Sequence, residues 1–198
     1  MAERALIFIA ETLVQLWTLA VMLRLLAQLL RVPFRARAGN PIVDFVIALT
    51  DWIVIPGRRF IPSIGRLDTT TVLVAWGAML LLATLKLLLL ERGAFTAPFI
   101  WPGLLAYSFV EALKLLVYLL IGLIIVQAVI SWISPYHPLR PFFDSLTRPV
   151  LKPFQKMIPL IGGVDLSPLF AILALQLVLM LPVAWLGSHA LLLFRGAA

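Results

Sequence analysis

Residues 40–68 read NPIVDFVIALTDWIVIPGRRFIPSIGRLD, and the same pattern returns 97 positions later, at residues 137–165, as HPLRPFFDSLTRPVLKPFQKMIPLIGGVD. Ten of the 29 aligned positions are identical, and several of them are proline or glycine, which constrain the backbone. Each copy lies between two long apolar runs, so we interpret the chain as two tandem helix–loop–helix repeats, residues 1–97 and 98–198. The residues expected to shape the two loops are Pro41, Pro62, Gly65, Asp68, Pro138, Pro159, Gly162, Gly163 and Asp165.

The composition is typical of a membrane protein. Hydrophobic residues make up 63% of the chain and charged residues 13%, and the mean hydropathy is +1.08, whereas about a quarter of the residues of a soluble domain are charged. About 20 apolar residues in a helix cross the hydrocarbon core. Four runs are long enough, at roughly residues 6–30, 70–90, 104–133 and 166–194. The first run is too long for the core of a signal peptide, so we expect it to be retained.

The basic residues indicate how the chain is oriented. Ten of the sixteen lysines and arginines fall within residues 31–68 and 134–165, which lie on one side of a four-helix topology. The positive-inside rule therefore predicts that both repeat loops are cytoplasmic and both termini outside. The two repeats share one orientation and are thus parallel. The fold class that we predict is an all-α membrane protein with four transmembrane helices and interfacial amphipathic helices in the loops.

The net charge of +7 has more than one explanation. Nucleic-acid binding would need a recognisable motif, and none is present. Contact with anionic lipid headgroups, or with a membrane-protein partner, fits a basic surplus that follows the topology. The residues expected to dock a lipid or partner are Arg58, Arg59, Arg148, Lys152 and Lys156.

Enzyme and cofactor signals are missing from the sequence. The chain has no cysteine, which excludes disulfides, thiolate metal sites and cysteine nucleophiles. It also has no phosphate-binding glycine loop, no zinc spacing and no nucleophile-elbow motif. We therefore predict no catalytic residues, no metal site and no cofactor.

The first loop predicts an amphipathic helix that begins after Asn40, with Pro41 at its first position. One side of this helix, over residues 41–54, is expected to hold Ile42, Phe45, Val46, Leu49 and Ile53. The corresponding apolar side in the second loop holds Leu139, Phe142, Phe143 and Leu146. Closely spaced prolines follow in both copies and are expected to break the helix there.

An aspartate stands directly before the second span of each repeat, Asp68 in the first and Asp165 in the second. The simpler interpretation is that each caps the helix that follows. The alternative is a cation or partner site at the two related helix starts.

Charged residues inside the spans are functional candidates by default. Glu111 and Lys114 are three residues apart and share a helix face, which Tyr107 and Tyr118 extend. They form either an ion pair in a wet outer rim or a polar seam that faces the first span, where Glu11 and Gln15 lie at similar depth. Residues expected only to reach toward the span ends are Arg24 and Lys86. Single amides expected to make interhelical hydrogen bonds are Gln28, Gln127 and Gln176.

The second copy carries the motifs that make the chain recognisable. The segment from Ser131 to Pro138 reads SWISPYHP, and LTRP follows at Leu146–Pro149 and IPLIGGVDLSP at Ile158–Pro168. These residues resemble the repeat signature of the YggT (YlmG-like) membrane protein family, and the resemblance covers the whole chain. The first copy departs from it where Asp51-Trp52 replaces Arg148-Pro149 and Arg66 replaces the second glycine, and where three threonines at 69–71 replace Leu166-Ser167-Pro168.

The resemblance implies a location in a bacterial inner membrane or a chloroplast. It also implies links to osmotic or salt tolerance, to envelope organisation and, in plastids, to maturation of a haem-bearing cytochrome complex. The leading hypothesis is a non-enzymatic membrane scaffold or assembly factor, acting with a membrane-protein partner or as a homo-oligomer. A small channel or transporter of the osmotic response is second. Haem or cytochrome assembly is third, because a span separates His137 from His189 and the two cannot ligate one haem.

Overall fold

The computed structural model describes residues 2–32, 40–64, 67–90, 100–134, 136–158 and 165–195. These residues form the helices α1 (Ala2–Leu29), α2 (Pro41–Gly57), α3 (Thr69–Leu90), α4 (Ile100–Ile133), α5 (Arg140–Met157), α6 (Ser167–Val178), the π-helical turn η2 (Leu179–Val183) and α7 (Ala184–Arg195). Within this described part of the chain, β-structure is limited to an isolated bridge between Ile64 and Leu67. The predicted loop residues Gly65, Pro159, Gly162 and Gly163 lie outside the described residues.

Four of the helical segments are long and apolar enough to cross a membrane: Ala5–Leu29, Thr69–Leu89, Trp101–Ile133 and Ser167–Leu192. They agree with the four predicted spans, which confirms the all-α membrane fold. The fourth segment contains the π-helical turn, with Pro182 inside it. Proline lacks the N–H that an α-helix uses and clashes with the preceding turn, and a π-turn is one way for a helix to absorb this defect.

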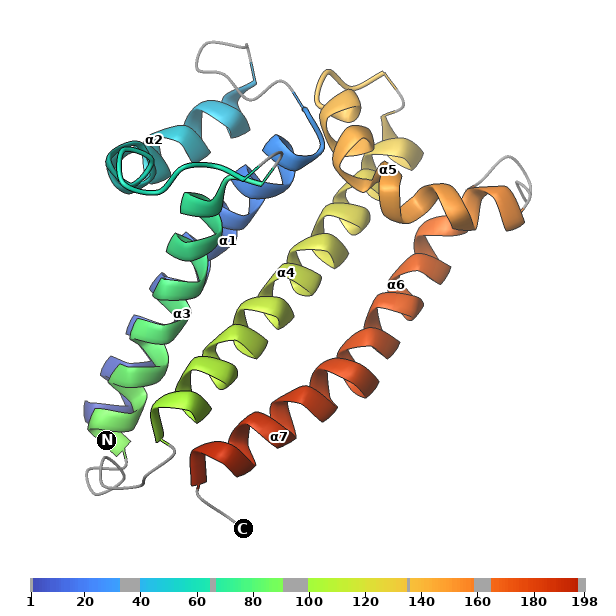
Figure 1. The fold of residues 1–198 in the computed structure, drawn as a ribbon. Helices are drawn as coiled ribbons and strands as arrows, with labels where there is room; N and C mark the ends of the chain where they lie inside the picture. Colours follow the sequence, from blue (N-terminus) through green and yellow to red (C-terminus); the bar gives the residue numbers. More distant parts are fainter. Residues whose placement is uncertain are drawn as a thin grey trace.

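The spans form a bundle whose two ends differ. α1, α3 and α4 pack against one another, and α7 packs on α4. Figure 1 shows the short helices α2 and α5 together at one end, which we call the loop end, and both chain termini at the opposite, terminal end. α2 lies against α1 and α3, whereas α5 lies against α4 and α6. Each half of the chain therefore places one short helix at the loop end, although the division into repeats stays a prediction.

An apolar core at the loop end joins the two halves. Phe142 and Leu146 of α5 pack with Leu26 of α1, Val43 of α2 and Leu123 of α4. Because this core draws on α1, α2, α4 and α5, the two loop helices are held relative to each other by buried contacts as well as by the chain.

The α2 helix begins as predicted, and its buried face coincides only in part with the predicted apolar side. The Asn40 side chain accepts a hydrogen bond from the backbone N–H of Ile42 at 3.0 Å, and Pro41 occupies the first turn. The buried residues of α2 are Val43, Val46, Thr50 and Val54. On the predicted apolar side, Val46 is buried and Phe45 is 62% exposed. The prediction named an apolar side and not the face that packs on the spans. The helix is apolar on most of its circumference, and hydropathy alone does not decide which face packs.

The expectation that prolines break the second loop helix is wrong. α5 continues through Pro149 and Pro153 to Met157. Both prolines lie on the exposed side of the helix, where water or polar headgroups can hydrogen-bond to the carbonyl groups that proline leaves free. The buried side carries Phe142, Phe143 and Leu146 as predicted.

Candidate functional site

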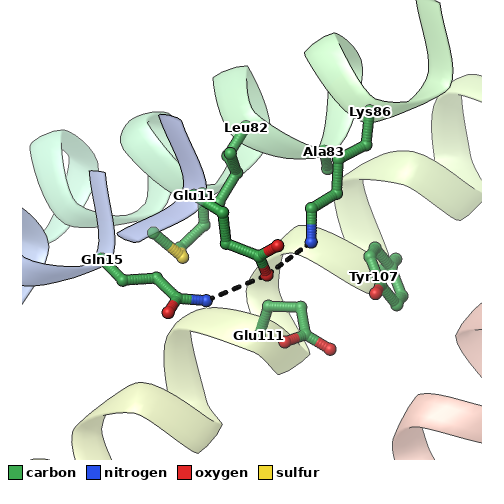
Figure 2. Close-up of a pocket in the computed structure, with 8 residues that line it drawn as sticks. Glu11, Gln15, Leu82, Ala83, Lys86, Tyr107 and Glu111 are labelled. Carbon is green, nitrogen blue, oxygen red and sulfur yellow. Dashed lines mark hydrogen bonds and ion pairs between the residues drawn. The ribbon is translucent and has the colours of Figure 1, made fainter. Parts of the chain in front are cut away.

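A cluster of charged and polar side chains lies between α1, α3 and α4 toward the terminal end. Figure 2 shows Glu11 of α1 and Glu111 of α4 facing the same pocket, with Lys86 reaching in from α3. Lys86 Nζ lies 2.5 Å from Glu11 Oε1, and the Gln15 amide donates to the same oxygen at 3.2 Å. We call this group the terminal-end cluster; its members are Glu11, Gln15, Lys86, Tyr107, Glu111 and Lys114.

A second acid–base pair belongs to the same cluster. Lys114 Nζ donates to Glu111 Oε1 at 2.7 Å, and the two side chains are 32% and 30% exposed. The structure thus brings Glu11, Gln15 and Glu111 to one pocket, although they come from two spans. This is the arrangement that the polar-seam hypothesis required.

A cavity of about 270 Å³ adjoins this pair. It is lined by Gln15, Met79, Glu111, Lys114, Leu115 and Tyr118. Met79 stands midway along the span Thr69–Leu89, about 15 Å of helix from either end. The cavity therefore reaches the middle of the membrane span, and it is roomy enough for several water molecules.

The loop end contains a second polar group, which we call the loop-end network. Arg24 of α1 is 5% exposed and donates to Thr50 Oγ1 at 2.7 Å and to Asp51 Oδ1 at 2.6 Å, both on α2. The Gln28 amide, oriented to satisfy its neighbours, accepts from Arg24 Nε at 3.2 Å and from Arg58 at 2.9 Å. The members of the network are Arg24, Gln28, Thr50, Asp51, Arg58, Asp68 and Thr71.

Two ion pairs, one in each polar group, contradict the sequence expectation. Arg24 and Lys86 were expected to extend toward the span ends, but each instead pairs with a carboxylate of another helix. The partners lie 27 residues away for Arg24 and 75 residues away for Lys86. No local signal in the sequence identifies such pairs, because both depend on how the helices pack.

Asp68 ties the end of α2 to the start of α3. Its carboxylate accepts from Arg58 Nε at 2.9 Å and from Thr71 Oγ1 at 2.7 Å, and it lies 3.4 Å from the backbone nitrogen of Thr71. Burial alone would raise the pKa of Asp68, but the hydrogen bonds from Arg58 and Thr71 and the positive charge of Arg58 outweigh it and hold the pKa below its ordinary value. The cation facing this aspartate is therefore a residue of the chain itself.

Asp165 has a similar position before α6. It accepts from the backbone N–H of Ser167 at 2.8 Å and from the Gln155 amide at 2.9 Å. Burial would raise the pKa of Asp165, but hydrogen bonds from Ser167 and Gln155 lower it below its ordinary value. In each half, a residue ten positions before the aspartate donates to it, Arg58 in one and Gln155 in the other.

The predicted docking residues lie on the surface of the loop end. Arg148, Lys152 and Lys156 are all exposed and follow one another at four-residue spacing along α5. Residues at this spacing share one face of a helix. We call this face the basic stripe; it lies opposite the buried side that carries Phe142 and Leu146. Arg58 and Arg59 are also exposed, but Arg58 is engaged with Asp68.

An apolar layer separates the two polar groups. Along α1, Val21 and Met22 stand between Gln15 and Arg24, and along α3 the buried Ala75 and Met79 stand between Thr71 and Lys86. The layer consists of Val21, Met22, Ala75, Met79, Leu82 and Ala112. Among the described residues, this apolar layer lies between the terminal-end cluster and the loop-end network.

The histidines have local roles. His137 Nδ1 accepts from the backbone N–H of Leu139 at 3.2 Å. His189 lies against Trp185, with ring centroids 4.1 Å apart. Among the described residues, no group of three or more histidine, cysteine or acidic side chains is placed to hold a metal ion.

Comparison with known proteins gives a consistent family. The sequence profile described as CCB3/YggT matches residues 4–90 and 106–186. A protein of Pseudomonas aeruginosa, named Uncharacterized protein PA0392, is 35% identical over 181 residues, which cover 90% of this chain and 88% of that protein. A Vibrio alginolyticus protein, named as uncharacterised in the proC 3′ region, is 34% identical over 85% of this chain and 88% of its own length. Uncharacterized protein YggT of Escherichia coli K12 is 32% identical over 86% of this chain and 85% of its own length. No solved structure matches the chain.

Proposed function

This chain belongs to the CCB3/YggT family, and we propose from that premise that it is a non-enzymatic membrane scaffold whose loop end binds anionic lipid headgroups. The observation that carries the proposal is the basic stripe, where Arg148, Lys152 and Lys156 line the exposed face of a helix that is buried on its other side.

The positive charge of the basic stripe favours an anionic ligand, which here is a lipid headgroup. α5 packs against two spans, α4 and α6, at the loop end (Figure 1). We therefore expect its exposed face to lie near the headgroups. Each lysine or arginine close to an anionic membrane surface gains about 1 kcal/mol. Three such residues on a rigid helix give a weak but oriented attraction, and the same charges favour a cytoplasmic loop end in an inner membrane.

The scaffold part of the proposal rests on the loop-end core and network. These buried contacts fix α2 and α5 relative to the spans, so a bound partner would meet a preformed surface. Tyr136 is fully exposed beside α5 and is a suitable position for a photoreactive residue. Crosslinking in cells from Tyr136 is expected to capture a discrete membrane protein or a second copy of the chain.

The lipid test compares phosphatidylglycerol with phosphatidylcholine as additives to the purified protein. Phosphatidylglycerol should stabilise the wild type against unfolding by up to about 3 kcal/mol, and replacing Arg148, Lys152 and Lys156 by glutamine should remove this difference. The matched control replaces Arg4, Arg92 and Arg195 by glutamine, which removes the same charge from residues that the sequence predicts to lie on the side of the termini. Equal loss in both triple variants would mean that net charge, and not the stripe, governs the effect.

A small transporter is the second candidate, because the cavity beside Glu111 reaches the middle of the membrane span. This function needs the apolar layer to open during a cycle. Solute flux into proteoliposomes that disappears in the variants Glu111→Gln or Asp165→Asn would place transport ahead of the scaffold function.

A further inference from the structure

The terminal-end cluster has a charge balance that the scaffold function does not use. It contains two ion pairs, Glu11 with Lys86 and Glu111 with Lys114, so the formal charges of these four side chains sum to zero. Ions at membrane depth are costly unless they are compensated. A ligand with net charge would leave one group without compensation, whereas a neutral ligand that carries both signs would preserve the balance.

The cavity offers complementary groups for such a ligand. Lys114 has three N–H donors, and Glu111 takes one of them. Along α4, Lys114 stands between Glu111, one turn before it, and Tyr118, one turn after it, and all three line the cavity. A carboxylate and an aromatic face both attract a cationic nitrogen, while the ammonium of Lys114 attracts an anionic group.

We propose that the cavity between α1, α3 and α4 binds a small zwitterion, with its cationic nitrogen against Glu111 and Tyr118 and its anionic group against Lys114. Binding exchanges the internal Glu111–Lys114 pair for two pairs with the ligand, so the net charge of the cluster does not change. The volume of about 270 Å³ lies below the range of drug-sized pockets and suits a compact molecule.

Two sources can supply this chemistry. One is a free zwitterionic solute, which would enter from the terminal end past Glu11 and Lys86. The other is the phosphoethanolamine headgroup of a lipid, which would enter sideways past Tyr118, a residue of the span α4 that is 58% exposed. Gln15 lines both the cavity and the smaller pocket beside Glu11, so the two routes meet at the same binding groups.

The test uses the full chain in neutral detergent, with binding measured by calorimetry and by the shift in unfolding temperature. The free-solute probe is glycine betaine, and choline and acetate serve as the half-ligands. The lipid probe is phosphatidylethanolamine in nanodiscs, compared with phosphatidylglycerol. We expect glycine betaine to bind at least tenfold more tightly than choline or acetate. For the lipids, we expect the response to phosphatidylethanolamine to depend on Glu111 and Lys114, and any response to phosphatidylglycerol at the basic stripe not to depend on them.

The variants locate the site. The double variant Glu111→Gln with Lys114→Gln keeps the net charge and should weaken binding at least tenfold, because hydrogen bonds to charged groups are the strong ones. Tyr118→Leu is a second variant, for use if the double variant does not fold. Because Tyr118 is exposed, the change should leave folding intact, and loss of the aromatic ring should weaken binding of the cationic nitrogen. Gln176→Leu is the control, since Gln176 is a polar residue of a span that lines neither cavity.

The possible outcomes distinguish a free solute from a lipid headgroup, and some of them would overturn the proposal. Binding of glycine betaine that both cavity variants weaken supports a free solute, and the same dependence with phosphatidylethanolamine alone supports a lipid headgroup. Choline or acetate binding as tightly as the zwitterions would overturn the proposal. So would absence of binding by every probe, or an equal loss in the Gln176 variant.

Discussion

Replacement of Arg24 by methionine removes the charged group that joins α1 to α2 at the loop end. The guanidinium group is buried and donates to Thr50 at 2.7 Å and to Asp51 at 2.6 Å. Methionine keeps a long, flexible apolar side chain of comparable reach, so the change removes the charge and its hydrogen bonds with little loss of packing.

The magnitude follows from what the variant leaves behind. Breaking a buried ion pair by removing one partner costs about 3–5 kcal/mol when the other charge stays buried. The Asp51 side chain is 34% exposed, so it recovers part of its hydration and the cost falls toward the lower end of that range. We expect Arg24→Met to lower the free energy of unfolding by about 3 kcal/mol and its coupling to Asp51→Asn to be about 2 kcal/mol.

The assay is a double-mutant cycle, with unfolding of the purified protein by an ionic detergent followed by tryptophan fluorescence. Trp17 and Trp52 report on this region, because their ring centroids lie 6.0 Å apart and both donate to the backbone oxygen of Leu49. The control is Arg59→Met, which removes an exposed arginine and should cost less than about 0.5 kcal/mol. A coupling energy between Arg24 and Asp51 below about 0.5 kcal/mol would refute the reasoning.

Three further predictions concern local features. Gly57→Ala should destabilise the chain by about 1–3 kcal/mol, because the added Cβ would meet Thr70 Cγ2 at 2.6 Å, whereas Gly77→Ala, with nothing within 4 Å, should not; comparison of their unfolding curves checks this. The pKa of Asp68 is lower in the folded protein than in the unfolded chain, where it is about 3.9, so its contribution to stability is complete above that value. The contribution is lost as the pH falls through the lower folded pKa. Below about pH 4, the stability of Asp68→Asn should therefore fall less steeply with pH than that of the wild type. Arg31, two residues after the end of α1, has a φ of 56°, which favours glycine. Arg31→Gly should therefore raise stability by up to about 1 kcal/mol in the same assay, and a loss would contradict the cost assigned to this conformation.

The spans were predictable because a bilayer imposes a simple length and polarity requirement, and hydropathy satisfies it without reference to any partner. The cap at Asn40 and the buried side of α5 were predictable for a similar reason, since both depend on residues within one turn of each other. These features are local in the chain, and local physics decides them.

The pairs that build the polar groups were not predictable in the same way. Lys86 pairs with Glu11 only because α1 and α3 pack side by side. The sequence of α3 is apolar on all sides, so it does not predict which face of the helix turns toward α1. The face of α2 that packs on the protein could not be predicted for a related reason, since Val43, which is buried, and Phe45, which is exposed, are both apolar and only packing distinguishes them. The continuity of α5 through Pro149 depends on the exposure of that side of the helix.

The apolar layer makes opposite demands on the two candidate functions. From Gln15 to Arg24 along α1 is nine residues, or about 13 Å, and the intervening hydroxyl of Thr18 is taken by the carbonyl of Val14 at 2.7 Å. A scaffold needs this layer closed and rigid, whereas a transporter must hydrate it once in every cycle because an ion cannot cross such a distance of apolar packing unaided. Ala75→Leu would overfill the layer, so it should abolish any transport yet leave the lipid response of the basic stripe intact. Flux that survives this variant would place the transport route outside the apolar layer, and a lipid response lost with it would mean that the two ends of the bundle are coupled.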